Sequence, residues 1–471
     1  MEIGMNEKDK NVKELNSAQK YFFGVGDLAF GWMTNIETYY YTYFLTNVAQ
    51  FPLALVTIIS TIGSLVDAAL CWVYGIILNK MKPMKWGRYR SALIVFPWTV
   101  PLLYMLMFRA FNNGVTGAIL IVLGCISSHI LWNFPYCANM AMINVAAKNA
   151  DQRNTLSATR GMWTYIGRCL YAYVGPGVLT FFTAKIGLEN AYGATAFAFA
   201  ALMAVGYFTH FVMFKGYEET GAEEMARLAQ EKKKAEGKKV GIIQALASNP
   251  QILGVLGSYL FYMMNSFCYS AFAVYYANYI ALDAGFITTY LFISNLAAVI
   301  GSVVSKRVAN RLSTKTTYQL AMVIIAVMYM LAYVFRYTPN LVIVFTSIAG
   351  FFTAFVTIMV IPMLANCAIY SEYKTGVNVT GTVMGFLNIP IKVAILGRSF
   401  LITTVLAITG FDASIAVEAA TGSVKNGIAM GFTLIPAILI VVGLVIVTVG
   451  YRIKDQDIAQ YAAEIRSRKQ A

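Results

Sequence analysis

The chain has 471 residues, of which 58% are hydrophobic and 12% are charged, and its formal net charge is +14. Soluble domains usually carry about 25% charged residues, and a single hydrophobic core stops growing near ~300 residues, so this composition excludes a water-soluble globular protein. A chain with this composition is expected to lie in a lipid bilayer. The basic residues lie mainly in loops, where they orient a membrane protein, so the charge does not indicate a nucleic-acid partner.

The sequence lacks the motifs of common enzymes and metal sites. The six cysteines lie inside apolar runs and form no C-x-x-C pair, so they predict neither a zinc site nor a disulfide framework. The patterns H-E-x-x-H, G-x-x-x-x-G-K-[ST] and G-x-S-x-G do not occur. The chain is therefore expected not to be an enzyme and to hold no cofactor or metal. Without a nucleotide site, energy is expected from an ion gradient or from a solute gradient.

The predicted elements begin after a polar segment. Residues 1–19 contain no apolar core of a signal peptide and are expected to form a cytoplasmic tail. A bilayer-spanning helix needs roughly 20 mostly apolar residues. Twelve such helices are expected, over 20–48, 52–79, 90–110, 115–147, 155–183, 190–214, 250–280, 284–305, 316–336, 341–372, 376–408 and 426–451. Several exceed this length, so tilted or protruding helices are expected.

Lysine and arginine divide unevenly between alternate loops. With the N-terminus inside, the expected external loops contain only Arg109, Lys185, Arg336 and Lys425, while the expected cytoplasmic segments carry dense clusters of both residues. Cytoplasmic loops of membrane proteins carry an excess of these cations. The pattern predicts an even number of spans with both termini in the cytoplasm.

The longest polar interruption lies between the sixth and seventh expected spans and is rich in glutamate and lysine. It predicts a cytoplasmic linker between two six-helix halves, a layout typical of major-facilitator transporters. The expected parts are an N-terminal tail (1–19), an N-terminal half (20–214), the linker (215–249), a C-terminal half (250–451) and a cytoplasmic C-terminal tail (452–471).

Ionisable side chains occur inside the expected spans. Each costs roughly 2.5–3.5 kcal/mol to insert, so such residues indicate functional positions. They are Asp27, Glu37, Asp67, His129, Arg160, Arg168, Lys392 and Arg398. Asp27 and Lys392 are the leading functional candidates, because they lie in opposite halves, where a midplane site is expected.

These residues also have structural interpretations. Arg168 and Arg398 could bind the carbonyls at helix ends. Glu37 lies ten residues beyond Asp27, about 15 Å along a helix, and could face a different helix. His129 could be a satisfied core residue, although an imidazole also titrates near neutral pH.

Aromatic residues are abundant, with 30 Tyr, 30 Phe and 6 Trp. Tyr275, Tyr276 and Tyr279 cluster late in the seventh expected span. The favoured interpretation is a belt of rings at the membrane–water interface. The alternative is a set of rings that stack on a sugar or an aromatic solute.

Several short motifs give a more specific indication. They are GVGDLAFG at 24–31, VDAALCWVYG at 66–75, KWGRYR at 85–90, NFPY at 133–136, RNTLSATR at 153–160 and IYSEYKTG at 369–376. In this order, over nearly the whole chain, they resemble the glycoside–pentoside–hexuronide:cation symporter family. The resemblance implies an all-α major-facilitator fold of twelve transmembrane helices, with a sugar-type site between the halves.

The resemblance also implies roles for single residues. Asp27 matches an aspartate that accepts hydrogen bonds from sugar hydroxyls, and Arg160 matches an arginine that pairs with it. A carboxylate beside an arginine fork suits a polyol. Further solute contacts are expected from Asn133, Tyr136 and Glu37. The loop residues Lys85, Arg88 and Arg90 are expected to gate the cytoplasmic side.

The expected coupling site departs from the family pattern. Asp67 matches one sodium-binding acid, but Cys71 and Asn133 stand where the family has two others. Sodium prefers several hard oxygen ligands, so sodium coupling is not expected. A proton needs one titratable group, and Asp67, His129 or Glu37 is expected to carry it. The resemblance implies that Lys392 matches a family lysine near the cation site.

The expected function is alternating-access transport of a sugar, glycoside or sugar acid, driven by protons, by a monomer in the cell's inner membrane. Cys137 replaces a family aromatic residue that contacts sugars. The same fold could therefore carry an amphipathic or aromatic solute, such as a steroid, a conjugate or a lysolipid. Uncoupled facilitation or export also stays open.

Overall fold

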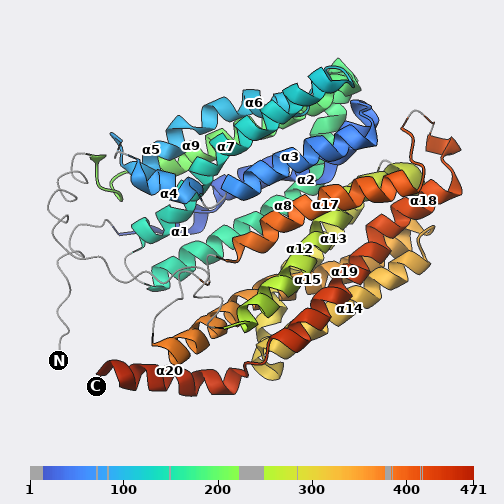
Figure 1. The fold of residues 1–471 in the computed structure, drawn as a ribbon. Helices are drawn as coiled ribbons and strands as arrows, with labels where there is room; N and C mark the ends of the chain where they lie inside the picture. Colours follow the sequence, from blue (N-terminus) through green and yellow to red (C-terminus); the bar gives the residue numbers. More distant parts are fainter. Residues whose placement is uncertain are drawn as a thin grey trace. The chain divides into compact units, whose positions relative to one another are not determined.

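The computed structural model describes residues 14–70, 73–81, 84–147, 150–221, 249–283, 285–376, 383, 386–413, 415 and 417–470. Throughout this part of the chain the regular structure is helical, without strands (Figure 1). Eleven helices in it are long and apolar enough to cross a membrane. The chain is therefore a multi-pass membrane protein.

Eleven of the expected spans correspond to these helices. The first, over 20–48, is also helical, but it is not one of the eleven. Asp27, Glu37 and a run of tyrosines lower its mean hydropathy. The most polar span therefore supplies two of the candidate site residues.

Contacts between Cα atoms divide the chain into two compact units. The first comprises Met1–Glu37 and Phe44–Glu236, and the second comprises Thr38–Tyr43 and Gly237–Ala471. The exact parts expected from the sequence, from the N-terminal tail to the C-terminal tail, stay predictions.

The first unit contains the helices up to α9. They are α1 (Ser17–Phe22), α2 (Val25–Tyr43, whose last six residues group with the second unit), η2 (Phe44–Val48), α3 (Leu53–Leu70), α4 (Val73–Lys80), α5 (Arg88–Val95), η3 (Pro97–Thr99), α6 (Val100–Met107), α7 (Val115–Ala146), α8 (Ala150–Ile186) and α9 (Leu188–Met213). Helix α6 packs against α7 and α9, and α3 packs against α7.

Local sequence explains the breaks in these helices. The expected span over 90–110 is divided into α5, η3 and α6 at Pro97 and Pro101, since proline has no N–H to donate and clashes with the preceding turn. Helix α1 begins at a capping box, in which Asn16 and Gln19 each accept a hydrogen bond from the other's backbone N–H.

The second unit contains the remaining helices. They are α12 (Gln251–Tyr276), η4 (Ala277–Ala281), α13 (Phe286–Leu312), α14 (Thr314–Val334), α15 (Pro339–Thr375), α17 (Asn388–Ile408), η5 (Val417–Ala419), α18 (Gly422–Ala429), η6 (Met430–Leu434), α19 (Ile435–Gly450) and α20 (Asp455–Gln470). Helix α15 packs against α13 and α14, and α12 packs against α17 and α19. Most of the start of the expected span over 376–408 lies outside the described residues.

The tyrosines of α12 and η4 correct one expectation. Tyr275, Tyr276 and Tyr279 are at most 2% exposed. The rings of Tyr276 and Phe432 lie 4.9 Å apart, and those of Tyr279 and Phe411 lie 5.5 Å apart. The interfacial-belt interpretation is wrong for these three tyrosines, because aromatic packing inside the unit holds them away from lipid.

The C-terminal segment has a defined place within its unit. Helix α20 packs along α15, where the ring of Tyr461 stacks on that of Tyr373 at 4.6 Å. Arg468 donates a hydrogen bond to the carbonyl oxygen of Tyr373 at 2.8 Å. The segment expected as a tail is therefore mostly a helix docked on α15.

Candidate functional site

Asp27 and Arg160 form an ion pair inside the first unit. Arg160 Nε, on α8, donates to Asp27 Oδ1, on α2, at 2.8 Å. The side chain of Asp27 is 2% exposed, whereas that of Arg160 is 22% exposed. The pairing implied by the sequence resemblance is therefore present, with the arginine as the more accessible partner.

A second donor holds the other carboxylate oxygen. Asn139 Nδ2, on α7, donates to Asp27 Oδ2 at 3.0 Å. Asn139 Oδ1 lies 2.7 Å from His210 Nδ1, on α9, and the backbone N–H of Gly26 donates to His210 Nε2 at 3.2 Å. Four helices thus meet around one buried carboxylate.

Glycines in the GVGD motif allow this close approach. A Cβ atom at Gly24 would lie 2.6 Å from Trp163 Cβ and 2.9 Å from the Cα of Arg160. A Cβ atom at Gly26 would lie 2.9 Å from the Cε1 atom of His210. The motif brings the backbone of α2 against α8 and α9, which sets the distance between the carboxylate and its partners.

Aromatic rings line the pair. The guanidinium of Arg160 lies over the ring of Tyr136, with Cζ 5.7 Å from its centre. The ring of Phe30 stacks on Tyr136 at 4.9 Å and lies 5.1 Å from Trp132. Tyr136, predicted as a solute contact, therefore lies beside Arg160. A cation, a carboxylate and aromatic rings are groups that bind polyols.

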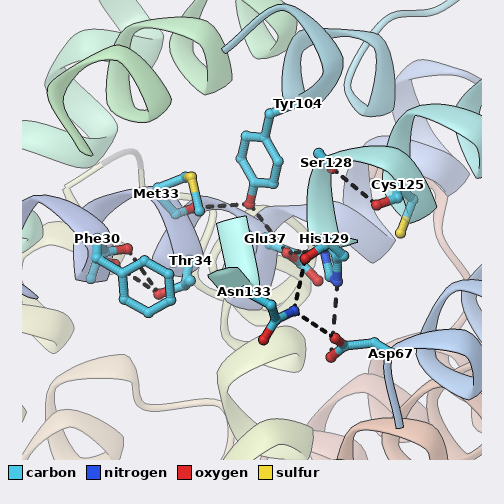
Figure 2. Close-up of polar contacts among 11 residues, drawn as sticks. Phe30, Met33, Thr34, Glu37, Asp67, Tyr104, Cys125, Ser128, His129 and Asn133 are labelled. Atoms are coloured by element: carbon cyan, nitrogen blue, oxygen red, sulfur yellow. Dashed lines mark hydrogen bonds and ion pairs between the residues drawn. The ribbon is translucent and has the colours of Figure 1, made fainter. Parts of the chain in front are cut away.

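A second polar cluster surrounds His129 (Figure 2). His129 Nε2, on α7, lies 3.1 Å from Glu37 Oε2, on α2. The other ring nitrogen lies 3.9 Å from Asp67 Oδ2, on α3. Tyr104 of α6 donates its hydroxyl proton to Glu37 Oε2, at 3.2 Å, or to the carbonyl of Met33, at 2.9 Å. One imidazole thus lies between two carboxylates.

Asn133 completes this cluster. Its Nδ2 donates to Asp67 Oδ1 at 3.1 Å and to the carbonyl oxygen of His129 at 2.8 Å. Asp67, His129 and Asn133 are each at most 8% exposed. The structure therefore places Asn133 and Glu37, predicted as solute contacts, with the predicted coupling residues Asp67 and His129.

The remaining predicted coupling residue is Lys392, and Cys71 is a departure from the family's sodium ligands. Lys392 is the fifth residue of α17, in the second unit, and is partly exposed. Cys71 lies outside the described residues. Among those that are described, no group of three or more His, Cys, Asp or Glu side chains could hold a metal ion.

The predicted gating loop is anchored within its own unit. The carboxylate of Glu218 accepts hydrogen bonds from the backbone N–H groups of Arg88, Tyr89 and Arg90, each at 2.8 Å. The guanidinium of Arg90 donates to the carbonyl oxygen of Phe211 at 2.9 and 3.2 Å. Arg88 and Arg90 are buried, while Lys85 is exposed. Their gating role stays a prediction.

Sequence reasoning missed Asn139, His210, Tyr104 and Glu218. His210 gave a signal that could have been used, because it is the second of only two histidines in the chain and lies in an expected span. Asn139 is six residues beyond Asn133 on a helix, which places the two on different faces. Tyr104 and Glu218 carried no distinguishing signal among many tyrosines and loop acids.

Known proteins resemble the chain over nearly its full length. It is 24% identical to a Salmonella typhimurium protein provisionally named a sulfoquinovose importer, over 99% of this chain and 96% of that protein. It is 22% identical to the isoprimeverose transporter of Lactiplantibacillus pentosus, over 89% and 86%. A crystal structure of a nucleoside transporter shares the fold, with a TM-score of 0.62 and 11% identity over 92% of this chain and all of that one.

A family description agrees with the fold and with these relatives. The family of MFS/sugar transport proteins matches residues 22–455, which is most of the chain. The matched region contains both polar clusters of the first unit. The chain belongs to the MFS/sugar transport protein family.

Proposed function

We propose that this protein carries a sugar, a glycoside or a sugar acid across the cell membrane by alternating access, together with a proton. The observation that carries the proposal is the Asp27–Arg160 pair, whose carboxylate is buried between helices of a membrane protein. Charged residues inside a membrane protein mark substrate pathways. Relatives named for sulfoquinovose, glucuronide and isoprimeverose agree with a sugar-type solute.

The contacts of the pair explain how it binds such a solute. Arg160 uses Nε for Asp27, and its guanidinium lies over the ring of Tyr136. Each oxygen of a carboxylate can accept more than one hydrogen bond. Solute hydroxyls therefore donate to Asp27 and accept from Arg160, while the aromatic rings cover the apolar face of the sugar ring.

The second cluster is suited to a proton. A protonated imidazole has an N–H on each ring nitrogen, and these point toward Glu37 and Asp67. A carboxylate oxygen near each ring nitrogen can accept one of these N–H groups. We assign proton coupling to His129 with these two acids. Lys392 belongs to the same proposal on the basis of the family resemblance.

Sodium does not fit the residues described. Asn133 presents its amide nitrogen to Asp67 Oδ1, where a sodium site would need an oxygen. The imidazole is close to the other oxygen of Asp67. A cation would have to displace both groups to gain the several oxygen ligands that it prefers.

The finer topology belongs to the same proposal. Twelve spans, with both termini in the cytoplasm, fit the loop charges. The polar first span, which completes the twelve, would be stabilised by its contacts with α7, α8 and α9. The loop of Lys85, Arg88 and Arg90 would then lie on the cytoplasmic side, and the protein would function as a monomer.

Uptake into vesicles tests the proposal. Proteoliposomes would be given labelled glucuronides, sulfonated sugars and pentosides, with an inward proton gradient, an inward sodium gradient or neither. Proton-driven uptake that a proton ionophore abolishes is expected. Uptake that depends on sodium and ignores the ionophore would disprove the coupling, and binding of steroids or lysolipids without any sugar would disprove the solute class.

A further inference from the structure

A chain of hydrogen bonds connects the backbone of α2 to the carboxylate of Asp27 by way of two other helices. It runs from the N–H of Gly26 to His210, from His210 to Asn139, and from Asn139 to Asp27. His210 and Asn139 are fully buried. The chain therefore starts and ends one residue apart on α2, and closes through α9 and α7.

The two ends of this chain impose one direction on it. A backbone N–H can only donate, so His210 Nε2 is an acceptor and carries no proton. The imidazole is then neutral, with its proton on Nδ1, and donates to Asn139 Oδ1 at 2.7 Å. This orients the amide of Asn139 with its nitrogen toward Asp27 Oδ2. An ionised Asp27, which only accepts, requires the same orientation.

Aromatic rings pack around the imidazole of His210 on three sides. Its ring stacks on Phe23 with centres 5.5 Å apart and nearly parallel planes. The edges of Phe214 and Tyr207 close the other sides, at 6.4 Å each. Within the described part of the chain, Gly26 and Asn139 supply its hydrogen bonds. The Cβ of any residue larger than glycine at position 26 would meet the imidazole.

We propose that His210 and Asn139 are positioning residues of the solute site, which hold the carboxylate of Asp27 in one orientation against Arg160 through a neutral, Nδ1-protonated imidazole. Neither residue reaches the solute. The proposal rests on the proposed function, since it concerns the solute-binding role of Asp27. The relay prevents Asp27 from rotating when solute hydroxyls compete for its oxygens.

The tautomer can be tested without any solute. The chain has two histidines, so the protein labelled with ¹⁵N-histidine gives two sets of imidazole signals, and His129→Gln leaves only those of His210. The expected spectrum shows a protonated Nδ1 and an unprotonated Nε2, although the other tautomer dominates in water. A spectrum of the Nε2-protonated tautomer, or of an imidazolium at neutral pH, would overturn the relay.

Two variants at one position separate positioning from folding. His210→Phe keeps a planar ring against Phe23 but removes both hydrogen bonds. His210→Asn places an amide nitrogen near the position of Nδ1, so it keeps the donor to Asn139 and loses only the contact with Gly26. Both variants leave the Gly26 N–H buried without its acceptor, so both are expected to lower the melting temperature of the purified protein by similar amounts.

Their transport kinetics are expected to differ. His210→Phe raises the KM for the solute about tenfold with little change in Vmax per folded protein, whereas His210→Asn stays within about twofold of the original KM. Asn139→Leu, which removes the donor to Asp27 at similar size, raises the KM at least as much as His210→Phe. Equal KM values for the two His210 variants would show a purely structural role.

The possible failures are distinguishable. If the original protein transports none of the sugars, the proposed function fails, while the tautomer measurement still tests the relay. If the original protein transports a sugar and His210→Phe leaves the KM unchanged, the proposed function stands and the positioning role is refuted.

Discussion

Replacing His129 by glutamine is the sharpest test of how transport is energised. The imidazole lies 3.1 Å from Glu37 Oε2 and 3.9 Å from Asp67 Oδ2, and the side chain of His129 is 10% exposed. Glutamine can keep a hydrogen bond to Glu37 but cannot bind a proton near neutral pH. The variant therefore removes the proposed proton site and retains a polar side chain of similar reach.

The structure sets the expected magnitude. One imidazole can bind one extra proton, so the proposed coupling moves one proton with each solute molecule. Each pH unit then supplies about 1.4 kcal/mol, which supports a tenfold accumulation of an uncharged solute. A gradient of about two pH units accordingly limits accumulation to roughly 100-fold.

Proteoliposomes that contain the purified protein provide the assay. The original protein is expected to concentrate labelled solute toward that limit, with a tenfold change per pH unit. His129→Gln is expected to equilibrate the solute to a ratio near one. Counterflow, in which internal unlabelled solute exchanges for external label, should continue in the variant, because exchange needs the solute site and no net proton movement.

Two results would refute this reasoning. Accumulation by His129→Gln at the level of the original protein would show that the proton binds elsewhere. A hundredfold change per pH unit in the original protein would show that two protons move. Loss of counterflow together with accumulation would indicate damage to the solute site, and Glu37→Gln then serves as the matched variant of the same cluster.

Three further changes have defined outcomes. Arg160→Lys replaces a planar guanidinium by a point charge that cannot bind Asp27 and the solute at the same time. Loss of a charge-assisted hydrogen bond of ~1.5–3 kcal/mol should raise the solute Kd roughly 10- to 150-fold in a binding titration. An unchanged Kd would exclude Arg160 from the site. Gly26→Ala forces the imidazole of His210 to move, since the new Cβ would lie 2.9 Å from its Cε1 atom. The KM for the solute should therefore rise as in His210→Phe, and an unchanged KM would contradict the close packing. Glu218→Gln weakens the hydrogen bonds to three N–H groups at the start of α5. It should lower the free energy of unfolding by about 0.5–2 kcal/mol without changing the Kd for the solute, and unchanged stability would mean that this cap contributes little.

The sequence alone was sufficient for the class of the protein. Apolar runs of bilayer length and few charges leave a multi-pass helical membrane protein as the consistent interpretation, because backbone groups in lipid must pair within helices. Eleven of the expected spans correspond to helices that could cross a membrane. Short motifs around Asp27 and Arg160 indicated the family, because the residues of each motif are contiguous in the chain. The family resemblance then implied the ion pair between Asp27 and Arg160.

Tertiary structure decided which polar residues belong together. Glu37 and Asp27 share one helix, yet Glu37 meets His129 of α7 whereas Asp27 meets Arg160 of α8. Sequence spacing gives the face of a helix but not the neighbour that the face meets. Asn139 and His210 belong to the site for the same reason. Asn139 contacts Asp27, which is 112 positions away in the chain, and His210 contacts Asn139, which is 71 positions away. The sequence supplied the buried charges, and the packing of helices selected a partner for each, because a buried carboxylate is stable only where donors from other helices reach it.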